Sequence, residues 1–238
     1  MFGACKGLSE PLPLISLDNV SFGYDGRPML QDVSIELSAG SFHFLTGPSG
    51  AGKTTLMKLL YLENRPRTGS LKLFSEETEG KPAEWIARTR RRIGIIFQDF
   101  RLLDHLSVVD NIALPLLAAG KNPASQGTDL ADLLRWVGLE QRAQAMPPQL
   151  SAGEKQRAAI ARAVMNSPDL ILADEPTGNI DPEMGGRILR MLVELNRLGK
   201  TVLVATHDIG LMRAAQGQAD AKVLRLVDGR LQQGGASL

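Results

Sequence analysis

Apolar and polar residues alternate along the first part of the chain, over residues 14–47. Val33, Ile35 and Leu37 are separated by polar residues, which is the period of a strand with one buried face. The run Gly-Tyr-Asp-Gly at 23–26 is rich in turn-forming residues. This part of the chain therefore predicts strands joined by turns.

The pattern changes at a glycine-rich loop at 47–52, which follows a strand expected over 41–45 and precedes a helix expected over 53–61. From residue 152 onward, short apolar runs alternate with longer stretches of helical period. The expected elements are a helix at 152–165, a strand at 169–174, a helix at 183–198, a strand at 201–205, a helix at 208–215 and a strand at 222–227. Strands that alternate with helices in this way indicate parallel pairing and an α/β fold.

The middle of the chain, about 82–148, is mostly helical in its pattern. A helix at 84–92 and a short buried strand at 93–97 are followed by helical pieces at 107–118, 128–137 and 140–145. We therefore expect a helical insertion between the N-terminal β-rich part and the last α/β part.

Composition narrows the classes of function. The 238 residues carry 27 Lys and Arg against 26 Asp and Glu, a net charge of +1, which argues against a globally basic nucleic-acid binder, so we expect no nucleic-acid partner. The single cysteine, Cys5, excludes an intramolecular disulfide and favours a reducing, cytoplasmic setting. The apolar stretch 112–119 is too short to span a bilayer and contains Pro115.

Residues 47–54 read Gly-Pro-Ser-Gly-Ala-Gly-Lys-Thr and match the phosphate-binding pattern G-x-x-x-x-G-K-[ST] between a strand and a helix. Glycines let backbone N–H groups approach phosphate oxygens, and the helix N-terminus adds a partial positive charge. We expect Lys53 to reach the β- and γ-phosphates and Thr54 to hold Mg²⁺. The predicted phosphate contacts are Gly47, Pro48, Ser49, Gly50, Ala51, Gly52, Lys53, Thr54 and Thr55.

Two carboxylates end the apolar run at 170–173. That run is typical of a central strand buried on both faces, and ligands of open α/β sheets bind at the carboxyl ends of such strands. Asp174 is therefore a candidate Mg²⁺ ligand. Glu175 would point the other way and is a candidate general base for the attacking water.

Ser151 precedes a predicted helix and is a candidate N-cap, so the backbone of 151–153 forms a second anion cradle. Placed between the phosphate loop and the carboxylates, the run Leu150-Ser-Ala-Gly-Glu154 resembles the signature of ATP-binding cassette (ABC) ATPases. Ala152 departs from the usual glycine there, and its Cβ restricts φ.

Other positions carry the same resemblance. Tyr24 matches the aromatic residue that stacks on adenine, and Gln98 matches the Q-loop glutamine, which serves catalysis and Mg²⁺. Asp181 lies in the D-loop match, and His207 matches the switch histidine that senses the γ-phosphate. The resemblance therefore implies ATP and Mg²⁺ as ligands. It places Ser151, Ala152, Gly153, Glu154 and Asp181 at the nucleotide as well.

The resemblance also implies architecture. It predicts a P-loop NTPase (RecA-like) core of ABC type, an N-terminal antiparallel β subdomain and an inserted α-helical subdomain at about 98–150. The single domain would cover 14–232, with tails at 1–13 and 233–238. The family forms a head-to-tail homodimer on ATP, in which each nucleotide lies between the phosphate loop of one subunit and Ser151–Gly153 of the other.

Residues 99–116 and 173–181 resemble the bacterial cell-division ATPases of this family, while the Glu-Pro-Thr-Gly-Asn block is shared with ATPases of lipoprotein release and macrolide efflux. The first resemblance implies a peripheral protein on the cytoplasmic face of the inner membrane, bound to an integral FtsX-like partner. That partner would dock near Phe100, Arg101, Leu102 and Leu103.

Several alternatives stay open. The apolar residues of the docking stretch are equally well explained as core. The cluster Arg88–Arg92 is either a solvated helix face or a contact with anionic lipid, and His43 and His105 are structural or solvated. A soluble ABC factor of translation or DNA maintenance, or a nucleotide-gated interaction protein, would share the motifs.

Overall fold

The computed structural model describes residues 13–232. Within them, six strands form one sheet in the order β10-β9-β3-β8-β7-β6. These strands are β3 (Phe42–Thr46), β6 (Ile93–Ile96), β7 (Leu170–Asp174), β8 (Thr201–Ala205), β9 (Ala221–Val227) and β10 (Arg230–Gln232). All neighbours pair in parallel except β10, which is antiparallel to β9. The parallel sheet that the alternation of strands and helices predicts is confirmed.

The central strands of this sheet are buried on both faces. In β7, Ile171 and Ala173 belong to a cluster formed with α5 and α6, while Leu170 and Leu172 belong to a second cluster on the opposite face. Because successive strand residues point to opposite faces, one apolar run supplies both cores. This burial on both faces explains why residues 170–173 are all apolar.

A second sheet is antiparallel, in the order β2-β1-β4-β5. Its strands are β1 (Pro13–Tyr24), β2 (Arg27–Ser38), β4 (Thr68–Leu73) and β5 (Glu76–Glu77). The alternating residues Val33 and Leu37 of β2 are buried and face the cluster that contains helix α1 (Lys53–Leu60). This is the predicted antiparallel subdomain.

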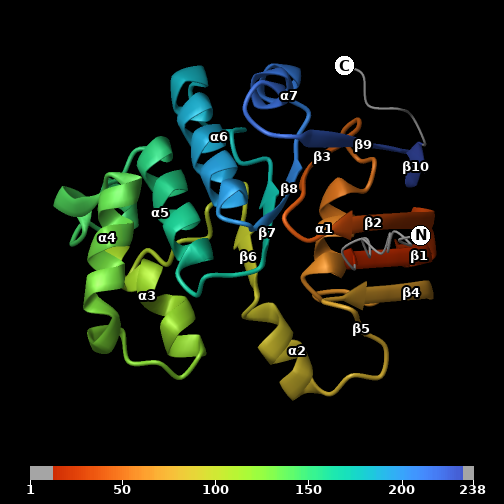
Figure 1. Ribbon diagram of the computed structural model, residues 1–238, viewed down its shortest axis with the longest axis horizontal. Helices are drawn as coiled ribbons and strands as arrows, with labels where there is room; N and C mark the ends of the chain where they lie inside the picture. The colour runs from red at the N-terminus through yellow and green to blue at the C-terminus, as the bar shows by residue number, and fades with distance from the viewer. Residues whose placement is uncertain (1–12, 233–238) are drawn as a thin grey trace, which may run out of the picture.

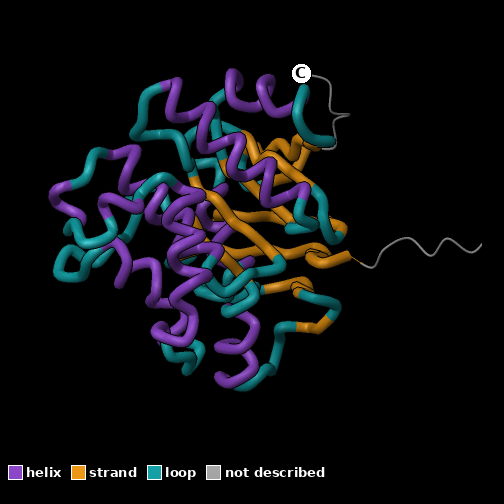
Figure 2. Tube along the Cα trace, turned by 60° about the vertical axis from the view of Figure 1, so that its left-hand side comes forward, coloured by secondary structure: helices purple, strands orange, loops and turns teal. Residues whose placement is uncertain are grey.

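The remaining helices are α2 (Ala83–Arg90), α3 (Val108–Ala118), α4 (Gly127–Val137), α5 (Ala152–Val164), α6 (Pro182–Arg197) and α7 (Ile209–Gln216). Helices α3, α4 and α5 pack together and form what we call the helical group. In Figure 1 this group lies on one side of the large sheet and the antiparallel sheet lies on the other, and Figure 2 shows the same separation. The predicted layout of core, β subdomain and helical subdomain is confirmed.

The predicted helix over 140–145 is wrong, because the structure has only a 3₁₀ turn, Glu140–Arg142. The carbonyls of Ala143 and Ala145 instead accept hydrogen bonds from Val109 and Val108, at 2.9 Å each. These donors are first-turn amides of α3, which have no partner inside their own helix. Within the stretch, backbone N–H groups bond carbonyls only three residues back, as from Arg142 to Leu139 and from Ala145 to Arg142 at 2.9 Å each, which is the 3₁₀ pattern.

The predicted tails, 1–13 and 233–238, lie outside the described residues, apart from Pro13, which begins β1.

A candidate nucleotide site at the carboxyl edge of the large sheet

Strand register brings the predicted site residues to one edge of the large sheet. Leu45 of β3 and Asp174 of β7 both pair with Ala205 of β8, and Ile96 of β6 pairs with Ala173 of β7. The loop at 47–52, the carboxylates, His207 and Gln98 all follow directly on these strand ends. Residues that lie far apart in the sequence therefore leave the sheet at the same edge, as open α/β sheets require of a ligand site.

The loop at 47–52 needs glycine at two positions for different reasons. Gly47 has φ 153°, and a Cβ there would lie 2.0 Å from the carbonyl oxygen of Leu226. Gly52 has φ 103° and caps α1, and a Cβ there would lie 2.8 Å from the carbonyl oxygen of Met29. The backbone can thus curl tightly in front of the N-terminus of α1, which is the geometry of an anion cradle.

Lys53 turns back over this loop. Its Nζ donates hydrogen bonds to the carbonyl oxygens of Gly47, at 2.8 Å, and Pro48, at 3.2 Å. The ammonium group is therefore held at the mouth of the cradle, where the predicted phosphates would lie.

Asp174 and Thr54 meet beside the cradle. Burial raises the pKa of the Asp174 carboxyl, Glu175 acts in the same direction, and a hydrogen bond from Thr54 and the charge of Lys53 act in the opposite direction. Mg²⁺ prefers oxygen ligands and takes a few from the protein and the rest from phosphates and water. One hydroxyl and one carboxylate next to a phosphate cradle fit that requirement.

Glu175 contacts His207 directly, a link that the sequence did not reveal. Its Oε1 lies 2.8 Å from Nδ1 of His207, and its Oε2 accepts a hydrogen bond from the Thr206 hydroxyl at 3.1 Å. The Glu175 side chain is 13% exposed and that of His207 is 74% exposed. Glu175 also has φ 44°, a left-handed backbone in which its N–H bonds the carbonyl of Ala205 at 2.8 Å. The carboxylate is therefore held in one orientation with one face toward solvent.

Gln98 lies just beyond the end of β6, and Tyr24 is the last residue of β1. Both side chains are exposed. The Gln98 carbonyl accepts a hydrogen bond from Asn179 at 3.3 Å. The Tyr24 ring packs edge-on against Phe22, and its hydroxyl accepts a hydrogen bond from Asn64. An exposed, braced aromatic ring is available for stacking.

Ser151 is the N-cap of α5, as predicted. It forms a capping box with Glu154, in which Ser151 Oγ accepts from the Glu154 N–H at 3.2 Å and Glu154 Oε2 accepts from the Ser151 N–H at 2.8 Å. These hydrogen bonds hold the pKa of Glu154 below its usual value. Ala152 is the first residue of α5 and has no left-handed φ, so its Cβ is accommodated without backbone strain.

Asp181 caps a second helix. Its carboxylate accepts from the N–H of Met184 at 2.9 Å at the start of α6. Within the described residues, no hydrogen bond joins Asp181 or Ser151–Gly153 to the loop at 47–52. The second cradle is thus separate from the first within one chain.

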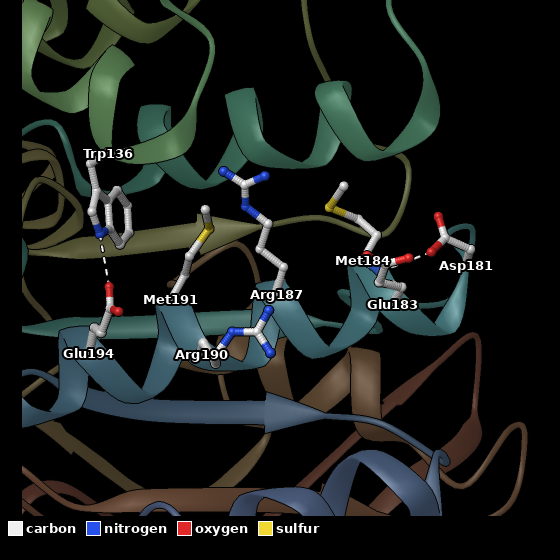
Figure 3. Close-up of a pocket in the computed structure, with 8 residues that line it drawn as sticks. All are labelled: Trp136, Asp181, Glu183, Met184, Arg187, Arg190, Met191 and Glu194. Carbon is white, nitrogen blue, oxygen red and sulfur yellow. Dashed lines mark hydrogen bonds between the residues drawn. The ribbon is translucent and has the colours of Figure 1, made fainter.

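A pocket of about 610 Å³ runs along α6 beneath the helical group (Figure 3). At one end Trp136 Nε1 donates to Glu194 at 2.9 Å, and Asp181 lies at the other end. Of the predicted nucleotide residues only Asp181 lines it. This pocket is therefore distinct from the phosphate cradle.

The stretch Phe100–Leu103 divides between core and surface. Leu102 packs against the core, whereas Leu103 is 41% exposed.

The arginine cluster divides as well. Arg90 donates to the carbonyls of Tyr61 and Leu62, and Arg92 pairs with Asp169 at 2.7 Å. Two members of the cluster therefore brace the fold, and Arg88 and Arg91 are exposed.

The other histidines also differ from each other. His105 is exposed, whereas His43 is buried in β3, and burial lowers its pKa to about 4. Both agree with the expectation of a solvated or structural histidine.

Comparison with known proteins gives concordant matches. Residues 30–178 match the family model described as ABC transporter. The cell division ATP-binding protein FtsE of Haemophilus influenzae is 44% identical over 202 residues, which cover 84% of this chain and 93% of that protein. The macrolide export ATP-binding/permease protein MacB of Burkholderia thailandensis is 41% identical over 92% of this chain but only 34% of its own length.

Among solved structures, the ATP-binding cassette MJ0796 in a dimeric post-hydrolysis state bound to ADP and Pi superimposes with a TM-score of 0.82. It is 32% identical, and the match covers 92% of this chain and 97% of that one.

Proposed function

Since the chain belongs to the ABC transporter family, we propose that it is the ATP-hydrolysing subunit of a bacterial cell-division complex. The observation that carries the proposal is the meeting of the phosphate cradle, Asp174, Glu175 and His207 at one sheet edge. The cell-division role is supported by the identity to FtsE over most of both chains. As a family member, the protein binds ATP with Mg²⁺ and hydrolyses it to ADP and phosphate.

The residues of this chain divide the chemistry as follows. Backbone N–H groups of 47–52 and the Lys53 ammonium hold the phosphates, and Tyr24 stacks on adenine. Thr54, Asp174 and Gln98 would hold Mg²⁺, which would offset the negative charge of the phosphates. Glu175 accepts a proton from the attacking water, and His207, hydrogen-bonded to Glu175, faces the γ-phosphate.

A second copy of the chain would complete each site. ABC cassettes dimerise, and MJ0796 was solved as a dimer. Ser151, Ala152, Gly153 and Glu154 stand at the N-terminus of α5, apart from their own chain's phosphate loop. In a head-to-tail dimer this helix N-terminus and Asp181 would meet the nucleotide held by the other subunit.

The membrane partner would be an integral FtsX-like protein that docks near Phe100, Arg101, Leu102 and Leu103. Support comes from the exposure of Leu103 beside the Q-loop match. Within residues 13–232, no helix is long and apolar enough to cross a membrane. The chain would then lie on the cytoplasmic face of the inner membrane, where Arg88 and Arg91 are available to anionic lipid.

An ATPase subunit of lipoprotein release or macrolide efflux is the second candidate, favoured by the identity to MacB. MacB is a joint ATP-binding and permease protein, and the match spans about a third of it.

Purification from detergent-solubilised membranes with ATP and a cross-linker tests these alternatives. Recovery of a four-span protein with a large extracytoplasmic loop supports the cell-division complex, and recovery of an efflux or lipoprotein-release permease supports the second candidate. The Lys53→Ala chain serves as the nucleotide-free control. Retention of full ATP affinity by that variant in calorimetry would contradict the proposed site.

A further inference from the structure

The segment between β6 and α3 has an unfavourable backbone. Phe100 and Arg101 have φ values of 60° and 49°. The left-handed region is disfavoured for a non-glycine residue, because its Cβ comes too close to the following carbonyl oxygen. Two such residues in succession persist only where neighbouring groups hold them.

Arg162 of α5 supplies that restraint at the start of the segment. Its Nη2 donates to the carbonyl oxygen of Phe100 at 2.6 Å, and its Nη1 donates to the carbonyl oxygen of Arg101. Burial lowers the pKa of Arg162. Among the described residues, no carboxylate lies within ion-pair distance of this guanidinium. The charge of this half-buried side chain is therefore compensated chiefly by the carbonyls of the two left-handed residues.

Asn111 of α3 restrains the far end of the segment. Its side chain is fully buried. Its Oδ1 accepts from the Leu103 N–H at 2.8 Å, and its Nδ2 donates to the carbonyls of Leu103, Leu106 and Ser107 at 3.0 Å each. One side chain thus satisfies both backbone groups of the exposed Leu103.

Attachment to the large sheet is weaker. The Gln98 carbonyl receives one bond from Asn179 at 3.3 Å, and the Phe100 N–H bonds the Phe97 carbonyl at 3.2 Å. The Arg101 guanidinium also lies over the Phe97 ring, 3.9 Å from its centre. The joint between the sheet and the segment therefore lies at Gln98–Asp99.

We propose that Arg162 is a positioning residue which, with Asn111, fixes residues 100–106 to the helical group so that they move with it as one body. The inference rests on the proposed function, in which this segment receives the membrane partner. Ser151 caps one end of α5 and Arg162 lies near its other end. The eleven residue steps from Ser151 to Arg162 correspond to about 16.5 Å of helical rise, so α5 is a rod between the second anion cradle and the docking segment.

Pairwise spin-label distances in the full chain test this. In a Cys5→Ser, Glu175→Gln background, a label at Leu103→Cys is paired with Ala131→Cys on α4 or with Ala214→Cys on α7, both of which are exposed. Labelled chain is diluted with unlabelled chain so that only distances within one subunit are read. We expect ATP to shift the 103–214 distance and to leave the 103–131 distance narrow and unchanged.

Arg162→Gln should broaden the 103–131 distribution, and Arg162→Lys, which retains a donor, should restore part of the narrow distribution. The control Arg190→Gln, on the exposed face of α6, should leave it narrow. The proposal is overturned if ATP shifts both distances equally, or if both Arg162 variants keep the wild-type distribution. The first measurement uses wild-type Arg162 and decides whether the segment moves with the helical group even if Arg162→Gln does not fold. In that case Arg162→Lys tests the role of Arg162. Absence of ATP binding in calorimetry would instead contradict the proposed function.

Discussion

Replacing Glu175 by glutamine separates proton transfer from the packing of the site. The carboxylate is nearly buried, with one oxygen 2.8 Å from His207 Nδ1 and the other 3.1 Å from the Thr206 hydroxyl. Glutamine has almost the same shape and keeps an oxygen acceptor for Thr206, but it cannot accept a proton from water. A general base contributes ~10²–10⁴ in rate, which corresponds to about 3–5 kcal/mol in the activation barrier.

The expected result is a loss of hydrolysis of that size with ATP affinity unchanged, because the phosphate cradle and Lys53 are untouched. Phosphate release in single turnovers at saturating ATP and Mg²⁺ measures the first quantity, and calorimetry measures the second. Glu36→Gln, on the exposed face of β2, is the matched control. A Glu175→Gln rate near that of the control would refute the assignment of the base.

Three further changes follow from the same structure. Asn111→Ala removes four hydrogen bonds at a fully buried position and should lower the free energy of unfolding by about 2–4 kcal/mol. Urea titration measures the loss. A loss below about 0.5 kcal/mol, the level of a neutral surface change, would contradict the bracing role of Asn111. The pKa of His43 is about 4 in the folded protein, against 6.5 in the unfolded chain. The unfolded chain therefore binds the extra proton, and the free energy of unfolding should fall by up to ~3 kcal/mol as pH drops from 6.5 to 4. His43→Leu should flatten that slope in pH-dependent denaturation. Ala152→Gly should leave the ATPase rate nearly unchanged and lower the free energy of unfolding by about 1 kcal/mol or less, because Ala152 already has a helical backbone. A large gain in the ATPase rate would show instead that the Cβ of Ala152 obstructs the site.

The parts of the fold that follow from local patterns could be predicted. The continuous apolar run of β7 predicts its burial on both faces of the sheet. The motif of the phosphate loop predicts its place between a strand and a helix. The capping box of Ser151 and Glu154 depends on residues three apart and was predictable for the same reason. The strand β4 was not predicted, because its buried Leu71 and Leu73 form too short an alternation to be distinguished from a loop.

Contacts between distant segments could not be predicted. Glu175 and His207 were assigned separate roles, and only the pairing of β7 with β8 places them 2.8 Å apart. Arg90 and Arg92 were grouped by sequence with their neighbours, but their partners lie in the turn after α1 and just before β7. The stretch 140–145 was misassigned because its helical period continues only as a 3₁₀ turn, and the contacts of its last carbonyls with α3 come from a distant segment.

The separation of the two anion cradles within one chain has a genetic consequence. If each composite site takes Lys53 from one subunit and Ser151 from the other, a single defective chain damages both sites of a mixed dimer only when it carries both defects. A strain that expresses a Lys53→Ala allele together with a Ser151→Arg allele would then assemble mixed dimers with one intact site and one doubly defective site. If one intact site suffices for division, the two inactive alleles would complement each other and each would be recessive to the wild-type allele. If both sites are needed, the two alleles would not complement and each would be dominant.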